Sequence, residues 1–430
     1  MWHDVHKTRK WWFITIFILL LAVVYILIDA RKTDVAGKVV ICIPVYGQSL
    51  ALGEEARRIT DFDKFTTQYE GRIVTENIDD KFGYFDSSSL KQYIKRLLHY
   101  RKRSFELSVY GMAESLASQL GPDTVICIFP GGQGATALAH LSKGTAPYNR
   151  FIADIEKAFK SATENGAHFC LPAICWMQGE SDIDTYPDTD YKQLLSQFQA
   201  DINDDVKRIT HQQDDVRIIC YQTNAVTKGE RFSENDFECV EAKVPQAMSE
   251  LLRDDTLFWA SGPTYPYSFV REYIHIDAIS QKRIGHLAAE SALGILRNSP
   301  RQMGLQPLSI SCADSSVLIH FNVPCPPLVF DTMSVAPVPN YGFKVIRHDG
   351  TDIASTVTVK NDTVTIQCTE VPIGCKVRYA INGAPLKSGY RIGPRGNLRD
   401  SQGDKDHVSI ADHQYPQHHW CFQFDETLSP

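Results

Sequence analysis

The sequence predicts an α/β protein with a parallel sheet, followed by a smaller β domain. As far as residue 299, short apolar runs of strand length alternate with amphipathic segments of helical period. Beyond that point the apolar runs follow one another, divided by Pro, Gly and Asn-Asp turns. Alternating strands and helices favour a parallel sheet covered on both faces, whereas successive short strands favour a small β-sandwich. We therefore expect three parts: residues 1–35, 36–299 and 300–430.

Five buried strands are expected in the α/β part, because uninterrupted apolar runs are typical of strands that are covered on both faces. They are residues 39–44, 124–129, 168–175, 216–221 and 257–260. Apolar residues recur with a helical period in three further segments, 151–162, 191–209 and 279–295. Residues 54–105 break this rhythm, and we interpret them as a long insertion that partly walls a site. A basic run within it, 95–103, is more simply a solvated helix face.

The N-terminal part contains a candidate membrane span. Residues 11–28 carry no charge and are almost wholly apolar. As a helix they would extend about 27 Å, close to the hydrocarbon thickness of a bilayer. We predict a single transmembrane helix with a cytoplasmic N-terminus and an extracytoplasmic body. A cleaved signal peptide, which would leave a secreted protein, is the alternative, although Asp29-Ala30-Arg31-Lys32 is a poor cleavage site.

Charge and cysteine content exclude some classes of protein. The net charge of −7 gives no electrostatic support for nucleic-acid binding. The 11 cysteines form no tight Cys/His cluster typical of zinc sites. His413, His418 and His419 lack carboxylate or thiolate partners at defined spacing, so no metal site is predicted. Disulfides remain open among Cys312, Cys325, Cys368, Cys375 and Cys421.

Reactive side chains gather at two strand ends and before the last helix. One expected strand runs into Gly47-Gln48-Ser49, and another into Cys175-Trp176-Met177-Gln178-Gly179-Glu180-Ser181-Asp182. Glu272-Tyr273-Ile274-His275 precedes the last helix. Open α/β sheets bind ligands at the carboxyl ends of their strands. A serine, a histidine and a carboxylate meeting there would form an activated acyl-transfer nucleophile.

These three blocks, within residues 38–297, resemble the carbohydrate-acetyl-esterase branch of the SGNH hydrolases. That branch includes the sialic acid O-acetylesterases and carbohydrate esterase family six. The WMQGESD loop is the specific part of the resemblance. The chain departs from the family at Leu50, where Asn is usual, at Glu272, where Asp is usual, and at Pro130, where Arg is frequent. The resemblance implies an SGNH-type three-layer sandwich and chemistry that requires neither a metal nor an organic cofactor.

The resemblance also assigns the nucleophile and the base. Ser49 would attack the ester, and its own backbone N–H would face the oxyanion. Its alternative role is the N-cap of a helix beginning near Leu50. His275 would act as general base and then as general acid. His286, inside the last amphipathic segment, is the competing histidine and is more simply structural.

The acid and the oxyanion donors are less specific. Glu272, three residues before His275, takes the position of the family's aspartate, with Asp277 and Glu180 as alternatives. The Gln178 side chain would donate to the oxyanion, together with the backbone N–H of Gly131 or Gly132. Glycine lets the main chain approach a substrate closely.

The resemblance implies a serine esterase that removes O-acetyl groups from carbohydrate, with sialic acid as the favoured sugar. An acetylxylan or other polysaccharide esterase would use the same residues, and a non-catalytic glycan-binding protein could retain the scaffold. The expected partners are an acetylated carbohydrate and the membrane, with no nucleic acid. Residues 300–430 would be an accessory β domain without chemistry of its own, so that truncation after Arg297 should spare the turnover of small esters.

Overall fold

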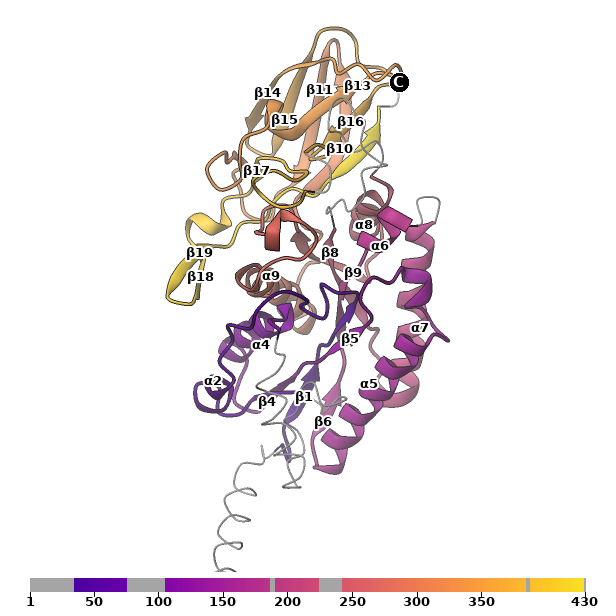
Figure 1. Ribbon diagram of the computed structural model, residues 1–430, viewed down its shortest axis with the longest axis vertical. Coiled ribbons are helices and arrows are strands. Elements are labelled where there is room, and N and C mark those ends of the chain that lie inside the picture. The colour runs from indigo at the N-terminus through magenta and orange to yellow at the C-terminus, as the bar shows by residue number, and fades with distance from the viewer. Residues whose placement is uncertain (1–34, 76–104, 186–189, 224–241, 384–386, 429–430) are drawn as a thin grey trace, which may run out of the picture.

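The computed structural model describes residues 35–75, 105–185, 190–223, 242–383 and 387–428 (Figure 1). The predicted membrane span, 11–28, and the basic run, 95–103, lie outside these ranges. Within them, no helix combines the length and the apolar character needed to cross a membrane.

The predicted parallel sheet is confirmed, and its strands form two adjoining groups. In the first group the order is β3 (Ile73–Val74), β4 (Thr124–Cys127), β1 (Val39–Cys42) and β6 (His168–Cys170). In the second it is β5 (Pro130–Gly132), β2 (Val45–Gly47), β7 (Ala173–Met177), β8 (Arg217–Gln222) and β9 (Phe258–Pro263). The N–H groups of Ile43 and Val45 continue the hydrogen bonding between the groups, donating to Cys127 and Phe129.

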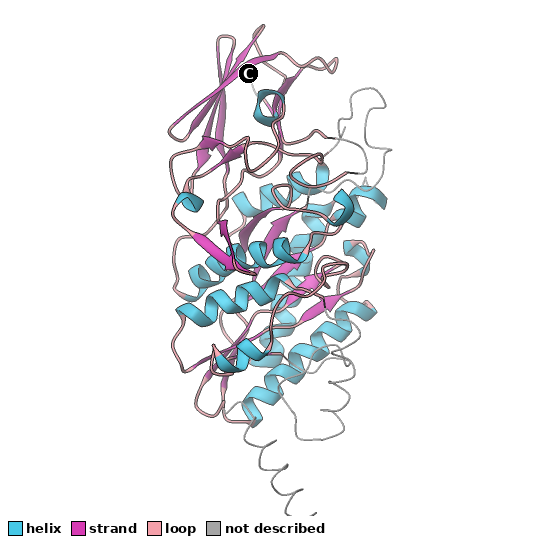
Figure 2. Ribbon diagram, turned by 60° about the vertical axis from the view of Figure 1, so that its left-hand side comes forward, coloured by secondary structure: helices cyan, strands magenta, loops and turns pink. Residues whose placement is uncertain are grey.

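Helices cover both faces of these strands, as Figures 1 and 2 show. α5 (Ala146–Glu164), α7 (Tyr191–Thr210) and α8 (Lys243–Asp254) pack in one apolar cluster, and α4 (Ser108–Gln119) and α9 (Ala278–Leu296) in the other. Along β1 the side chains alternate, so that Val40 lies in the first cluster and Ile41 in the second. α4 and α9 approach closely, because a Cβ atom on Gly285 would lie 1.9 Å from the Ser108 carbonyl oxygen.

Short helices and loops complete the α/β part. α2 (Asp63–Thr67) follows the serine-bearing loop, and α6 (Glu180–Thr185) begins in the WMQGESD loop. Two short 3₁₀ turns, η1 (Leu138–His140) and η3 (Val270–Glu272), precede α5 and α9.

Antiparallel strands form the region after residue 305, drawn in orange and yellow in Figure 1. One sheet has the order β10 (Gln306–Ala313), β11 (Ser316–Asn322), β15 (Thr363–Cys368) and β14 (Ala354–Lys360). A second consists of β13 (Phe343–Ile346), β16 (Lys376–Tyr379) and β20 (Phe424–Thr427). Two ribbons pair β12 (Val329–Phe330) with β17 (Leu398–Arg399), and β18 (His407–Ile410) with β19 (His413–Pro416). The two sheets share one apolar core. Two 3₁₀ turns, η4 (Pro339–Gly342) and η5 (Gln402–Asp404), connect these strands.

The cysteines among the described residues are all free thiols. These include the five residues among which disulfides were considered: Cys312, Cys325, Cys368, Cys375 and Cys421. Most of the described thiols are buried, where they pack as small apolar groups.

The end of the chain returns to the α/β domain. The Phe422 side chain, 1% exposed, belongs to the apolar cluster formed with α5, α7 and α8. The backbone N–H of Gln423 donates to Gln222 Oε1 at 2.8 Å, and Gln222 Nε2 donates to the Gln423 carbonyl at 3.0 Å. A chain truncated after Arg297 would lose this part of the α/β core. The turnover of small esters by such a truncated chain stays a prediction.

Candidate active site

Ser49 lies in the loop that follows β2, and its residue is 4% exposed. This loop crosses the end of β7, where the Gln48 N–H donates to the Met177 carbonyl at 3.0 Å. A Cβ atom on Gly47 would lie 2.0 Å from the same carbonyl oxygen. Glycine is therefore required before the serine, because no side chain fits between the two strand ends.

His275 meets Ser49 from the opposite end of the α/β domain's sequence. Its Nε2 atom lies 2.9 Å from Ser49 Oγ, and its side chain is 13% exposed. The imidazole belongs to the loop between η3 and α9, which is closed by a 2.7 Å hydrogen bond from the Val270 N–H to the His275 carbonyl. The structure thus brings together the two side chains predicted as nucleophile and base.

Glu55 supplies the carboxylate that contacts the histidine. Its Oε2 atom lies 2.8 Å from His275 Nδ1, and its other oxygen pairs with Arg271. Glu55 has a φ of 63°, a left-handed conformation that is uncommon for a side chain of this size. Sequence reasoning missed this residue, because it lies in the predicted insertion and outside every recognised motif.

Glu272 does not make the predicted contact with His275; its carboxylate pairs with two cations of the β domain instead. Glu272 Oε1 lies 3.1 Å from Arg391 Nη2, and Oε2 lies 3.9 Å from Lys387 Nζ. The backbone explains this correction, since both Arg271 and Glu272 have positive φ angles, 57° and 55°. The left-handed turn directs the Glu272 carboxylate toward the β domain and leaves Arg271 beside Glu55.

The two alternative acids have other partners. Asp277 caps α9, accepting a 2.8 Å hydrogen bond from the Ser280 N–H. Glu180 is 1% exposed, and its Oε1 atom accepts hydrogen bonds from the hydroxyls of Tyr221 and Thr223, both at 2.6 Å. Burial raises the pKa of Glu180, while these hydroxyls and nearby His275 act in the opposite direction. Glu180 therefore lies close to the histidine without replacing Glu55.

Gln178 is fully buried and its amide is already engaged. Nε2 donates to the Thr136 carbonyl at 3.2 Å and to Asp182 Oδ2 at 2.5 Å, while Oε1 accepts from the Tyr191 hydroxyl at 2.9 Å. An amide nitrogen has two N–H donors, and both have protein acceptors here. The predicted donation from Gln178 to an oxyanion is thus not supported by this geometry; the side chain braces the WMQGESD loop.

Gly131 and Gly132 lie on β5, beside the serine-bearing strand. Gly132 pairs in register with Gly47, and a Cβ atom on Gly132 would lie 1.8 Å from the Gly47 carbonyl oxygen. A Cβ atom on Gly131 would lie 2.3 Å from the Phe151 ring. The close packing of strand ends accounts for both glycines and places the Gly132 backbone next to the loop of Ser49.

Ser49 itself offers a main-chain donor at this position. Among the described residues, its backbone N–H has no hydrogen-bond acceptor. The competing role as a side-chain N-cap is not seen either, since the Ser49 hydroxyl is directed to His275.

His286 has the structural character expected of it. It lies within α9, and its Nε2 atom is buried without a partner among the described residues. Burial, assisted by Lys282, lowers the pKa of His286 to about 4. The imidazole is therefore neutral at pH 7.

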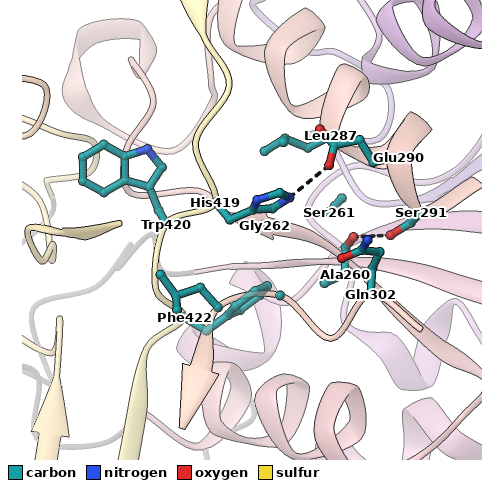
Figure 3. A pocket seen from close by; sticks show the side chains of 12 residues that line it. Ala260, Ser261, Gly262, Leu287, Glu290, Ser291, Gln302, His419, Trp420 and Phe422 are labelled. Carbon is teal, nitrogen blue, oxygen red and sulfur yellow. Dashed lines mark hydrogen bonds and ion pairs between the residues drawn. The ribbon is translucent and has the colours of Figure 1, made fainter. Parts of the chain in front are cut away.

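A pocket separate from Ser49 and His275, shown in Figure 3, lies where the end of the chain meets α9 and β9. Its wall includes His419, whose Nε2 lies 3.0 Å from Glu290 Oε2 and whose Nδ1 lies 2.8 Å from Asp400 Oδ2. Burial opposes the charge, but hydrogen bonds to Asp400 and Glu290 raise the pKa of His419 to about 10. The histidine, whose side chain is 12% exposed, is a cation that links α9 to the β domain. No group of three potential metal ligands occurs in the described ranges.

Parallel strands and their loops bring a serine, a histidine and a glutamate into one hydrogen-bonded line, which defines an α/β protein with the side chains of a serine esterase. Residues 98–294 match the family model described as carbohydrate esterase, sialic acid-specific acetylesterase. The family resemblance predicted from the three sequence blocks is confirmed.

A solved structure shows the same fold. A carbohydrate acetylesterase from Xanthomonas citri is 12% identical, with a TM-score of 0.52 over 84% of this chain and 80% of its own. Two further structures are similar at lower scores. NanS is 14% identical, with a TM-score of 0.40 over 61% of this chain and 99% of its own. Est24, a carbohydrate acetylesterase from Sinorhizobium meliloti, is 13% identical, with a TM-score of 0.31 over 60% and 99%. A search of curated proteins finds no match.

Proposed function

We propose that the protein is a serine esterase that removes O-acetyl groups from carbohydrate, most specifically from sialic acid. The observation that carries the proposal is the continuous hydrogen-bonded line from Ser49 through His275 to Glu55, with distances of 2.9 and 2.8 Å. A serine hydroxyl is a weak nucleophile at neutral pH and needs a base within this distance.

Each side chain of this line has a defined task in acyl transfer. His275 Nε2 accepts the proton of Ser49 Oγ as that oxygen attacks the acetyl carbonyl carbon. Glu55 accepts a hydrogen bond from Nδ1–H, which fixes the tautomer and stabilises the imidazolium as it forms. The backbone N–H groups of Ser49 and Gly132 are the proposed donors to the oxyanion.

The two halves of the reaction then use the same groups. His275 returns its proton to the departing sugar hydroxyl, leaving acetyl-serine. Water, deprotonated by His275, attacks this ester. The bond to Ser49 Oγ breaks, His275 gives the proton to that oxygen, and acetate is released. None of these steps requires a metal ion or an organic cofactor.

Sialic acid is proposed as the sugar on three grounds. The family description names sialic acid, and the WMQGESD loop resembles that group. The third ground is Arg271, whose side chain is 73% exposed beside Glu55 and offers a guanidinium to the carboxylate of an acidic sugar. An acetylxylan esterase is the neutral-substrate alternative. A glycan-binding protein without activity is disfavoured, because it would have no need of the Ser49–His275–Glu55 line.

Acetate release from a panel of substrates tests the proposal. The purified protein is given O-acetylated sialosides and acetylated xylan, and a Ser49→Ala variant is the matched control. We expect release from the sialosides by the wild type and none by the variant. Preferential release from xylan would contradict sialic acid as the substrate and favour the acetylxylan alternative. Undiminished turnover by Ser49→Ala would contradict the assignment of Ser49 as the nucleophile.

We further propose that residues 11–28 anchor the protein in a membrane, with the esterase body outside the cytoplasm. The support is the uncharged sequence of this segment and the location of polysaccharide substrates outside the cell. Protease digestion of intact cells tests the orientation, because an extracytoplasmic body would be cleaved without lysis. A body that is protected until lysis would contradict it.

A further inference from the structure

A loop of the β domain, residues 387–391, lies directly against the segment that leads to His275. The Ser388 N–H donates to the Glu272 carbonyl at 2.9 Å, and the Tyr390 N–H donates to the Tyr267 carbonyl at 3.2 Å. Ser388 is 2% exposed, so this contact is buried. Two segments more than a hundred residues apart in sequence are thus joined main chain to main chain.

Charges reinforce the same contact. The Glu272 carboxylate lies between Arg391, at 3.1 Å, and Lys387, at 3.9 Å. Both cations belong to the β-domain loop, and Glu272 stands three residues before His275. The side chains of Arg391 and Glu272 are 62% and 31% exposed, so the pair is partly solvated and is a modest contributor compared with the main-chain bonds.

The close approach depends on a glycine. Gly389 has a φ of +92°, and a Cβ atom there would lie 2.8 Å from the Tyr267 carbonyl oxygen and 3.0 Å from Phe269 Cδ2. No side chain fits at this position without displacing the segment that leads to the histidine. The loop is therefore in van der Waals contact with that segment along its main chain.

The segment that receives these contacts is strained. Arg271 and Glu272 both adopt left-handed backbone angles, which residues with a Cβ atom hold only when their surroundings determine the conformation. Here the hydrogen bond to the Glu272 carbonyl and the ion pairs to its side chain hold the backbone in this conformation. The position of this segment in turn fixes the backbone of His275, because the Val270 N–H donates a hydrogen bond to the His275 carbonyl.

We infer that the β domain contributes to catalysis, because its loop 387–391 holds the segment that carries His275 in place. Glu272 is a positioning residue in that contact. This inference rests on the proposed esterase function. His275 must satisfy two partners at once, Ser49 and Glu55, and a displacement of about 1 Å can reduce the rate of catalysis about a hundredfold. Glu272 thus acts on the rate without touching the imidazole.

Two alanine substitutions at glycines of the same domain provide the test. Gly389 and Gly350 have nearly equal φ angles, +92° and +87°, but a Cβ atom on Gly350 would meet nothing within 4 Å. Alanine imposes similar backbone strain at both sites. On a small chromogenic acetyl ester we expect Gly389→Ala to lower kcat about tenfold or more with little change in KM. Gly350→Ala should retain the wild-type kcat, and equal kcat values in both variants would overturn the inference.

Charge-neutral variants keep the test decisive if Gly389→Ala does not fold. We expect Glu272→Gln and the double variant Lys387→Gln/Arg391→Gln to lose a similar factor in kcat, up to about fivefold for a partly solvated pair. The triple variant should lose no more than either, because all three act through one contact. A loss in Glu272→Gln that the Lys387/Arg391 double variant does not share would overturn the inference. An inactive wild-type enzyme would instead contradict the proposed function.

Discussion

Glu55 Oε2 lies 2.8 Å from His275 Nδ1, on the side of the imidazole opposite the nitrogen that contacts Ser49. A carboxylate in this position fixes which nitrogen carries the proton and stabilises the imidazolium that forms as the serine is deprotonated. The same carboxylate also pairs with Arg271, which keeps one oxygen directed away from the ring.

Glu55→Gln should therefore be among the most damaging substitutions at the site. Loss of the carboxylate permits the unproductive tautomer, and we expect kcat on an acetyl ester to fall about 10³- to 10⁴-fold. Glu272→Gln is the comparison variant, and its loss should be several hundredfold smaller. Steady-state kinetics of the two variants measure these losses of kcat. A larger loss in Glu272→Gln than in Glu55→Gln would assign the orienting role to Glu272 instead.

Gln178 should act on stability more than on the rate. Its amide joins Thr136, Asp182 and Tyr191 in the buried WMQGESD loop. We expect Gln178→Met to lower the free energy of unfolding by about 1–3 kcal/mol, because buried partners are left without hydrogen bonds. Denaturant melts and kcat should be measured on the same preparation. A large loss of kcat at unchanged stability would instead support an oxyanion role for this side chain.

The sequence was informative where a motif coincided with a strand end. The Gly47-Gln48-Ser49 turn was predicted at a strand end from the apolar runs, since parallel strands place their carboxyl ends together. The role of His275 was implied by the family resemblance of the block that precedes the last helix. Glu55 could not be found in this way. It reaches the histidine from a loop with a left-handed backbone and no periodic pattern, and only the fold brings the two side chains together.

The helices and the C-terminal region show the same limit. α5, α7 and α9 were predicted from long apolar periods, whereas α4 was missed because it follows an irregular polar stretch and Ser, Gly and Ala occupy half of its buried positions. Of the strands after residue 305, the turns located β11, β13, β14, β15 and β16, whereas β10, β12, β17, β18, β19 and β20 were not predicted. Their attachment to the α/β domain was not predicted either, since the buried pairing of Gln423 with Gln222 has no local sequence signature.

His286 should make stability depend on pH in the acidic range. Burial lowers its pKa from about 6.5 when unfolded to about 4 when folded, so the unfolded state binds the proton more readily. Its contribution is present above pH 6.5 and is lost as the pH falls toward 4, by up to about 3 kcal/mol. We expect His286→Leu to flatten this part of the stability curve relative to the wild type. Parallel slopes for the two proteins in denaturant melts between pH 4 and 7 would contradict the assignment.

His419 should have the opposite dependence. Its partners raise its pKa to about 10, so its contribution is present below pH 6.5 and is lost as the pH rises through 10. His419→Gln leaves Asp400, which is fully buried, without its cation, and we expect a loss of about 3–5 kcal/mol at pH 7. A double variant with Glu290→Gln should lose less than the sum of the two single losses. Thermal melts at pH 7 measure the loss of stability in each variant. Strictly additive losses would show that His419 and Glu290 are not coupled.

Phe422 tests whether the last part of the β domain's sequence is also part of the α/β core. Its ring is 1% exposed in the cluster formed with α5, α7 and α8, although the residue lies two positions before β20 of the β domain. We expect Phe422→Ala to lower the free energy of unfolding by about 3–5 kcal/mol, because a cavity replaces the ring inside the α/β domain. Met333→Ala, at a side chain that is 94% exposed, is the control and should change stability little. Hydrogen exchange locates the effect. Faster exchange in α5, α7 and α8 is expected, and a loss of protection confined to the β strands after residue 305 would show that the two domains unfold separately.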